Sequence, residues 1–88
     1  MKIEKIIIKS IEGIDARYAA DMAAIVRKYD IEFALIQYKG LEYNLKSVLS
    51  IVSAQIPYGG EIELVVEGIQ KSELLTEIKF FLEELKNA

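Results

Sequence analysis

Chemically active side chains are scarce in this chain of 88 residues, which contains neither histidine nor cysteine. The absence of cysteine excludes disulfides, thiol nucleophiles and thiolate metal sites. The absence of histidine excludes imidazole phosphorylation, the usual Ser-His hydrolase arrangement and the commonest zinc ligand. We therefore expect no metal site and no cofactor. Two stretches still place a reactive or anion-binding group beside a cation, Asp15-Ala16-Arg17 and Lys46-Ser47.

Both stretches coincide with the predicted start of a helix. Ala19, Met22, Ala23 and Val26 recur at helical spacing, so the pattern predicts an amphipathic helix that follows Asp15 and ends near Tyr29. The Asp15 carboxylate is a good N-cap, because it can accept an amide of the first turn. Residues 47–54 predict a short helix, and the Ser47 hydroxyl at or near its start is an ordinary cap as well.

Strands and turns fill most of the remaining chain. Lys39-Gly40 is a hairpin signal, and the Pro and paired Gly of residues 55–60 indicate a turn. Ser72 can cap a last helix with one apolar side. The predicted strands cover residues 3–9, 31–38, 41–44 and 61–67, and the apolar side of the last helix comprises Leu75, Ile78, Leu82 and Leu85.

The order β-α-β-β-α-β-α predicts one α+β domain over residues 1–88. Strands joined by a hairpin, with helices that must cover one apolar face, indicate an open-faced β-sandwich: a four-stranded, mainly antiparallel sheet with three helices on one face. On pattern alone, a ferredoxin-like regulatory domain fits nearly as well.

Composition narrows the class of protein. Hydrophobic residues make up 52% of the chain, which favours a folded domain over disorder. The net charge is −3 and the eleven basic residues are scattered, so we expect no direct binding to nucleic acid. The N-terminal stretch is too short and too charged for a signal peptide or a membrane span. We expect no membrane association and a cytoplasmic location.

Three segments in register resemble the histidine phosphocarrier (HPr) family of the sugar phosphotransferase system. Residues 13–20, Gly-Ile-Asp-Ala-Arg-Tyr-Ala-Ala, resemble the family signature Gly-Ile/Leu-His-Ala-Arg-Pro-Ala. Residues 44–53 resemble its regulatory segment, Asn-Leu-Lys-Ser followed by an apolar helix. Residues 59–62 resemble its Lys-Gly-Ala-Glu-Ile motif. The resemblance spans about Lys2 to Leu85 and implies the HPr fold.

Two departures from the family pattern fall on the active site. Asp15 stands where the family has its phosphate-accepting histidine, and Tyr18 stands where it usually has proline. Tyr18 restores an N–H that the Asp15 carboxylate can accept, so a Pro-initiated helix has become an Asp-capped one. Arg17 is retained, and in the family it supports the phosphohistidine. From the residues alone, Arg17 pairs with Asp15, Glu12 or Asp21, or lies in solvent.

The resemblance also implies a regulatory role for Ser47. In one branch of the family the matching serine is phosphorylated by a dedicated ATP-dependent kinase, and the product is a corepressor for a LacI-type transcription regulator. A relative with its histidine replaced keeps only this role in catabolite repression. Arg17, Lys46, Val48, Leu49 and Val52 are then the candidate partner-binding residues. At least one of the two valines must also face the sheet.

Three functions follow from these observations. The leading hypothesis is a non-catalytic, HPr-like regulatory protein of carbon metabolism that is switched at Ser47 by a serine kinase and phosphorylase. The second is a component of the phosphoenolpyruvate-dependent relay that uses Asp15 in place of the histidine and binds the relay enzymes. The third is an adaptor that acts without modification.

The strand at residues 31–38 does not have a single apolar face. Phe33 and Leu35 follow one parity and Ala34 and Ile36 the other, and this part of the chain is one residue longer than the family pattern. We favour a β-bulge near Ala34-Leu35, which resets the parity. In the alternative, a regular strand, Phe33 and Leu35 lie on the helix-free face. They then join Ile7 and Val65 in an apolar stripe that favours a weak homodimer.

Overall fold

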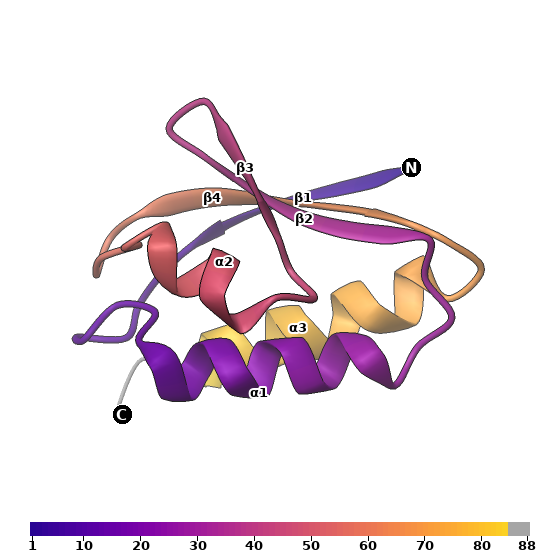
Figure 1. The fold of residues 1–88 in the computed structure, drawn as a ribbon, viewed down its shortest axis with the longest axis horizontal. Coiled ribbons are helices and arrows are strands. Elements are labelled where there is room, and N and C mark those ends of the chain that lie inside the picture. Colours follow the sequence, from indigo (N-terminus) through magenta and orange to yellow (C-terminus); the bar gives the residue numbers. More distant parts are fainter. Residues whose placement is uncertain (85–88) are drawn as a thin grey trace.

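A computed structural model describes residues 1–84, in which seven elements follow the predicted order. The strands pair in the order β1-β4-β2-β3, and all three pairs are antiparallel. All three helices lie on one side of the sheet (Figure 1). The α+β open-faced sandwich is therefore confirmed. The elements are β1 (Lys2–Ile7), α1 (Ala16–Arg27), β2 (Phe33–Tyr38), β3 (Leu41–Asn44), α2 (Val48–Ser53), β4 (Glu61–Glu67) and α3 (Lys71–Glu84).

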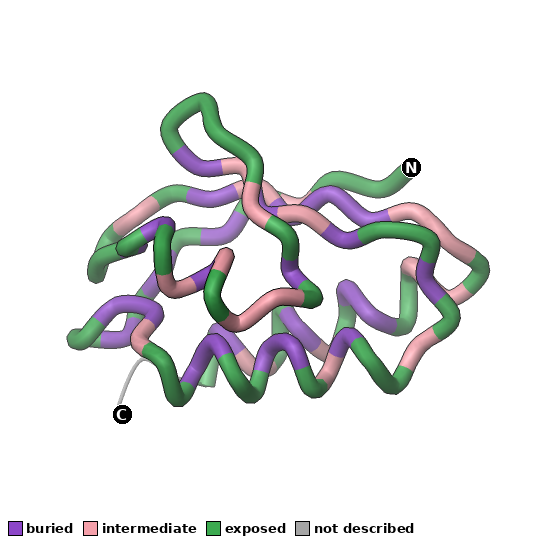
Figure 2. The backbone as a smooth tube through the Cα atoms, in the orientation of Figure 1, coloured by how far each residue is buried: buried purple, intermediate pink, exposed green. Residues whose placement is uncertain are grey.

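The core lies between the sheet and the helices. Alternate residues of a strand point to opposite faces, so one parity of β2 and of β4 is apolar and buried beneath the helices (Figure 2). In β1 only Ile6 is buried, and β3 has no buried residue. The predicted apolar side of α1 is fully buried, and so is the described part of the predicted side of α3. The core residues that face one another include Ile6, Ile36, Leu64 and Val66 from the strands and Ala19, Met22, Val26, Leu74, Ile78 and Leu82 from the helices.

The ends of the helices and strands lie within about two residues of the ends predicted from the sequence. Ile8 continues beyond β1 through an N–H that donates to the Gly60 carbonyl at 2.9 Å. The prediction that Ser72 caps α3 is wrong. The helix begins one residue earlier, the Leu74 N–H donates to the Gln70 carbonyl, and the Ser72 hydroxyl instead accepts from Lys2 Nζ. Leu85, the last residue predicted on the apolar side, lies outside the described residues.

The predicted β-bulge near Ala34-Leu35 is also wrong. The ladder between β2 and β4 continues without interruption, with Ala34 opposite Val66, Leu35 opposite Val65 and Ile36 opposite Leu64. The strand is therefore regular, and the second set of apolar residues lies on the face without helices. Among residues 1–84, no helix combines the length and the hydrophobicity needed to cross a bilayer.

Candidate functional site at the starts of α1 and α2

The loop before α1 is seated against the turn that follows α2. Gly13 has a φ of +71°, and a Cβ at this position would lie 2.4 Å from the Ile56 carbonyl oxygen. The neighbouring Ile14 N–H donates to that same oxygen at 2.9 Å. Only glycine fits this close approach of two backbones. The start of α1, with Asp15, is thereby held beside the end of α2.

Asp15 is the N-cap of α1, as the sequence predicts. Its Oδ1 accepts from the Tyr18 N–H at 3.1 Å, and its backbone is extended, as a capping residue requires. The Tyr18 side chain is buried at the same time. One residue thus supplies both the donor for the cap and an apolar anchor for the first turn.

Arg17 closes a small charged cluster over this cap. Its Nη2 donates to Asp15 Oδ2 at 3.1 Å and lies 3.6 Å from Glu12 Oε1. Its guanidinium carbon also lies 5.2 Å from the centroid of the Tyr18 ring, within the range of a cation–π contact. Two of the predicted pairings of Arg17 are therefore present, whereas the ion pairs of residues 1–84 do not include Asp21.

The hydrogen bonds at Asp15 favour its ionised form. The Tyr18 N–H is the main cause that holds the pKa of the Asp15 carboxyl below its ordinary value; desolvation opposes it less strongly, and the Arg17 guanidinium adds to the lowering. Asp15 in turn raises the pKa of Arg17. Both carboxylate oxygens are engaged, and a lower pKa weakens the oxygen as a nucleophile. The arrangement therefore suits a cap better than a phosphate acceptor.

The segment before α2 is fixed by its own hydrogen bonds. Asn44 Oδ1 accepts from the Lys46 N–H at 2.9 Å, and the Asn44 carbonyl accepts from the Ser47 N–H at 3.1 Å. Leu45 is fully buried, and its N–H donates to the Ala34 carbonyl. The sequence Asn-Leu-Lys-Ser is thus a turn that delivers Ser47 to the start of the helix.

Ser47 caps α2 as predicted, since its Oγ accepts from the Ser50 N–H at 3.1 Å. The two other serines of the helix make local hydrogen bonds. Ser50 Oγ accepts from the Asn44 N–H at 2.9 Å, and Ser53 Oγ donates to the Ser50 carbonyl at 2.7 Å. Ser47 alone precedes the first turn.

The basic side chains around Ser47 are not placed as the sequence alone suggests. Lys46 Nζ reaches away to donate to the Ile31 carbonyl at 3.2 Å, so its role beside Ser47 stays a prediction. Arg27, in the last turn of α1, donates from Nη2 to the Lys46 carbonyl at 3.4 Å. Sequence reasoning missed Arg27, because it is 19 residues from its acceptor. The available signal was a basic residue at the end of a helix.

The apolar candidates divide into core and surface. Val48 and Val52 are both partly buried and pack against the core cluster, as expected of core-facing residues. Leu49 is 82% exposed. Its side chain contributes little to the core and is the apolar group of α2 most available to another protein.

Asp15 and Ser47 contact different parts of α1 and its surroundings. Asp15 lies at the start of α1, beside Ile56 after α2, whereas the carbonyl of Lys46, next to Ser47, accepts from Arg27 in the last turn of α1. From its start, α2 runs back along α1 towards the end that carries Asp15 (Figure 1). Across residues 1–84, three or more acidic groups nowhere converge into a set able to hold a metal ion.

Comparison with known proteins decides the family. The model of a family described as "PTS HPr component phosphorylation site" matches residues 3–84. The chain belongs to the HPr family. The phosphocarrier protein HPr of Mycoplasma pneumoniae is 33% identical over 84 residues, which are 96% of each chain. That of Mycoplasma genitalium is 34% identical over 86 residues, 98% of each chain.

Solved structures agree on the fold. An HPr from Thermoanaerobacter tengcongensis superposes with a TM-score of 0.92 at 25% identity, over 100% of this chain and 98% of that one. HPr proteins are phosphocarriers that interact with other proteins of the phosphotransferase system. The absence of histidine is therefore the feature of this family member that any proposal for its function must take into account.

Proposed function

We propose that this HPr-family chain is a non-catalytic regulatory protein of carbon metabolism, switched by phosphorylation of Ser47 and acting through protein contacts. The observation that carries the proposal is the absence of histidine, together with an Asp15 whose two carboxylate oxygens cap α1 and bind Arg17. A phosphohistidine cannot form in this chain, and the residue at the histidine's place in the resemblance has a structural role.

Ser47 supports the other half of the proposal. The family's regulatory serine heads a short helix after Asn-Leu-Lys, and Ser47 has that sequence and that position. A phosphate there meets the free amides of the first turn, and Arg27 already reaches the carbonyl of the preceding residue, Lys46. The proposed partners are a serine kinase and phosphorylase and a LacI-type regulator, which contact Arg17, Lys46, Val48, Leu49 and Val52.

Incubation with a family-type serine kinase and ATP tests this proposal directly. Intact mass spectrometry should show the gain of one phosphate in the parent chain and in Ser53→Ala, but none in Ser47→Ala. Ser53→Ala is the matched control, because it removes a hydroxyl from the same helix. A phosphate that peptide mapping places on Ser50 or Ser53, or no phosphate at all, contradicts the proposal.

A second candidate is a relay component that carries phosphate on Asp15. The match to the family's phosphorylation-site model and the Arg17 guanidinium 3.1 Å from the carboxylate favour it. The third candidate, an adaptor that needs no modification, is left if neither Asp15 nor Ser47 accepts phosphate.

A further inference from the structure

The sheet face opposite the helices carries an apolar row at one end. Ile3 and Leu35 are the register partners of Val65 on its two sides. Val65 is only 4% exposed although no helix covers this face, whereas Ile3 is 53% exposed. Phe33, on the same face, is 38% exposed. We call Ile3, Phe33, Leu35 and Val65 the open-face stripe. A lone sheet face is normally polar, so the stripe requires an explanation.

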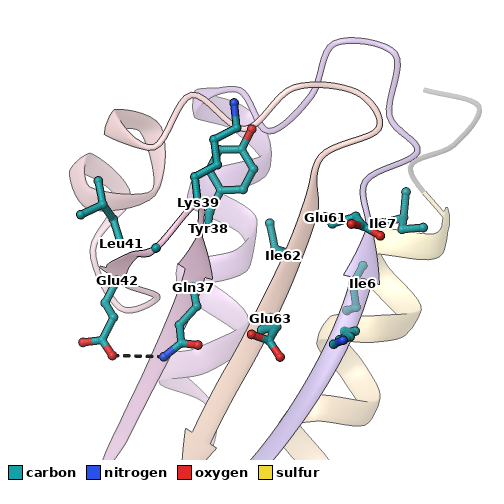
Figure 3. Close-up of a pocket in the computed structure, with 12 residues that line it drawn as sticks. Ile6, Ile7, Gln37, Tyr38, Lys39, Leu41, Glu42, Glu61, Ile62 and Glu63 are labelled. Carbon is teal, nitrogen blue, oxygen red and sulfur yellow. Dashed lines mark hydrogen bonds between the residues drawn. The ribbon is translucent and has the colours of Figure 1, made fainter.

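A polar row crosses the same face next to the stripe. Its register is Lys5 opposite Glu63, Glu63 opposite Gln37 and Gln37 opposite Glu42. Gln37 Nε2 donates to Glu42 Oε2 at 3.2 Å, as Figure 3 shows. A hollow of about 820 Å³ lies over this row and the adjoining hairpin. The polar row separates the open-face stripe from Ile7, which therefore does not belong to the stripe.

We propose that this face binds a second copy of the chain. In two copies packed face to face about a two-fold axis that runs along the strands between β4 and β2, β1 of each copy covers β3 of the other. Lys5 of one copy then faces Glu42 of the second copy, and Val65 faces Leu35. The symmetry repeats each pair, so the Lys5 of either copy meets the oppositely charged Glu42 of the other, and each Glu63 meets the uncharged Gln37.

The charges also exclude the other simple orientation. An axis across the strands along the polar row would place Lys5 against Lys5 and Glu63 against Glu63. Like charges that face each other repel. Of the two axes, only the one along the strands avoids like-charged pairs in the polar row and also sets Val65 against Leu35 of the other copy. Face-to-face sheets whose strands run nearly parallel are the usual packing of β-sandwiches.

The area of this face gives an estimate of how strongly two copies of the chain associate. Four strands about 4.8 Å apart and about six residues long cover about 19 by 20 Å. That footprint is below the roughly 800 Å² per partner of a standard interface, so the dimer is weak, with a Kd on the order of 0.1 mM. The helices, and with them Ser47, stay accessible in this dimer, which makes the inference independent of the proposed function.

Sedimentation equilibrium from about 10 µM to about 1 mM is the first test, because it spans the expected Kd. We expect the weight-average mass to rise from the monomer towards the dimer and to stop there. A mass that stays monomeric at all concentrations, or one that passes the dimer without a limit, overturns the proposal.

Charge reversal provides the sharper test, and both target residues are exposed. Lys5→Glu and Glu42→Lys should each weaken association by about tenfold, because each creates two like-charged pairs in every dimer. The double variant should restore it. Asp21→Lys on α1 is the matched control, with the same charge change as Glu42→Lys on the helical side, and should associate like the parent. If the double variant stays as weak as the single variants, the two copies do not pack as proposed.

Leu35→Lys tests the open-face stripe itself. It should abolish association while the far-UV circular dichroism spectrum stays that of the parent. Association of a folded Leu35→Lys at parental strength excludes the stripe as the contact. If this variant does not fold, the charge-reversal variants still decide the proposal.

Discussion

The Asp15 carboxylate accepts a hydrogen bond from the Tyr18 backbone N–H across 3.1 Å and so closes the first turn of α1. Asp15→Ala leaves that amide without its acceptor and should lower the melting temperature by about 4–8 °C. Asp15→Asn keeps an acceptor and should change it less. Thermal unfolding followed by circular dichroism measures both, and a neutral Asp15→Ala would show that the cap contributes no stability.

The pH dependence of stability provides a second test of the contact between Asp15 and Tyr18. The pKa of Asp15 is lower in the folded chain than its ordinary value of 3.8, with the Tyr18 N–H as the main cause. Its stabilisation is therefore fully present above 3.8 and is lost as the pH falls through the folded value. The difference in melting temperature between the parent and Asp15→Asn should hold at neutral pH and shrink below 3.8. A gap unchanged at about pH 2 would contradict this cause.

Phosphotransfer from phosphoenolpyruvate should fail in this chain. With no imidazole available, incubation with phosphoenolpyruvate and the first relay enzyme should leave the intact mass unchanged. Asp15→His is the informative variant, and we expect poor activity from it because Tyr18 alters the start of the helix. A stoichiometric gain of one phosphate by the parent, abolished in Asp15→Ala, would instead favour the Asp15 relay.

The cap at Ser47 should be measurable apart from any phosphorylation. Ser47→Ala removes the acceptor of the Ser50 N–H and should lower the free energy of unfolding by about 0.5–2 kcal/mol. Ser53→Ala removes a hydroxyl that bonds only within its own helix turn and should cost less. Urea unfolding of both variants provides the comparison, and equal losses would argue against a special position for Ser47.

Glu77 joins α3 to the end of α1. It accepts from Lys28 Nζ at 2.6 Å and from the Tyr29 hydroxyl, and these contacts hold the pKa of Glu77 below its ordinary 4.5. Its contribution is therefore present above 4.5 and is lost as the pH falls through the folded value. Glu77→Gln should melt at a lower temperature than the parent at pH 7 and at nearly the same temperature below about pH 3. An equal deficit at both pH values would mean that charge is not the cause.

Local signals predicted most of the fold and both caps. The spacing of Ala19, Met22 and Val26 predicts the buried side of α1, and the types of Asp15 and Ser47 predict their hydrogen bonds, because caps and periodicity act within a few residues. The parity of β2 could not be resolved in the same way. A bulge and a helix-free apolar face produce the same alternation, and only the pairing of Leu35 with Val65 distinguishes them.

The hydrogen-bond partners of long side chains could not be predicted from the sequence either. Lys46 is adjacent to Ser47 in the chain, yet its amine donates to the Ile31 carbonyl, while Arg27 comes to the Lys46 carbonyl from the end of another helix. The acceptor that such a side chain binds depends on which backbone carbonyls the fold places within its reach. Ser72 illustrates the same point, since a residue with a good capping side chain lies inside the helix and binds Lys2 instead.

The pairing of β1 with β4 has a consequence for how the chain is made. Lys2 is the partner of Val66 and Ile7 that of Glu61, so the first strand has no neighbour in the sheet until residues 61–66 have been synthesised. At about 5–20 residues per second, that delay lasts roughly 3–13 s on the ribosome. During this interval the β-branched N-terminal segment remains without its pairing strand, and the β2–β3 hairpin can form first because its contacts are local. We therefore expect the nascent chain to acquire its hairpin and α1 early, and its complete sheet only after β4 has emerged.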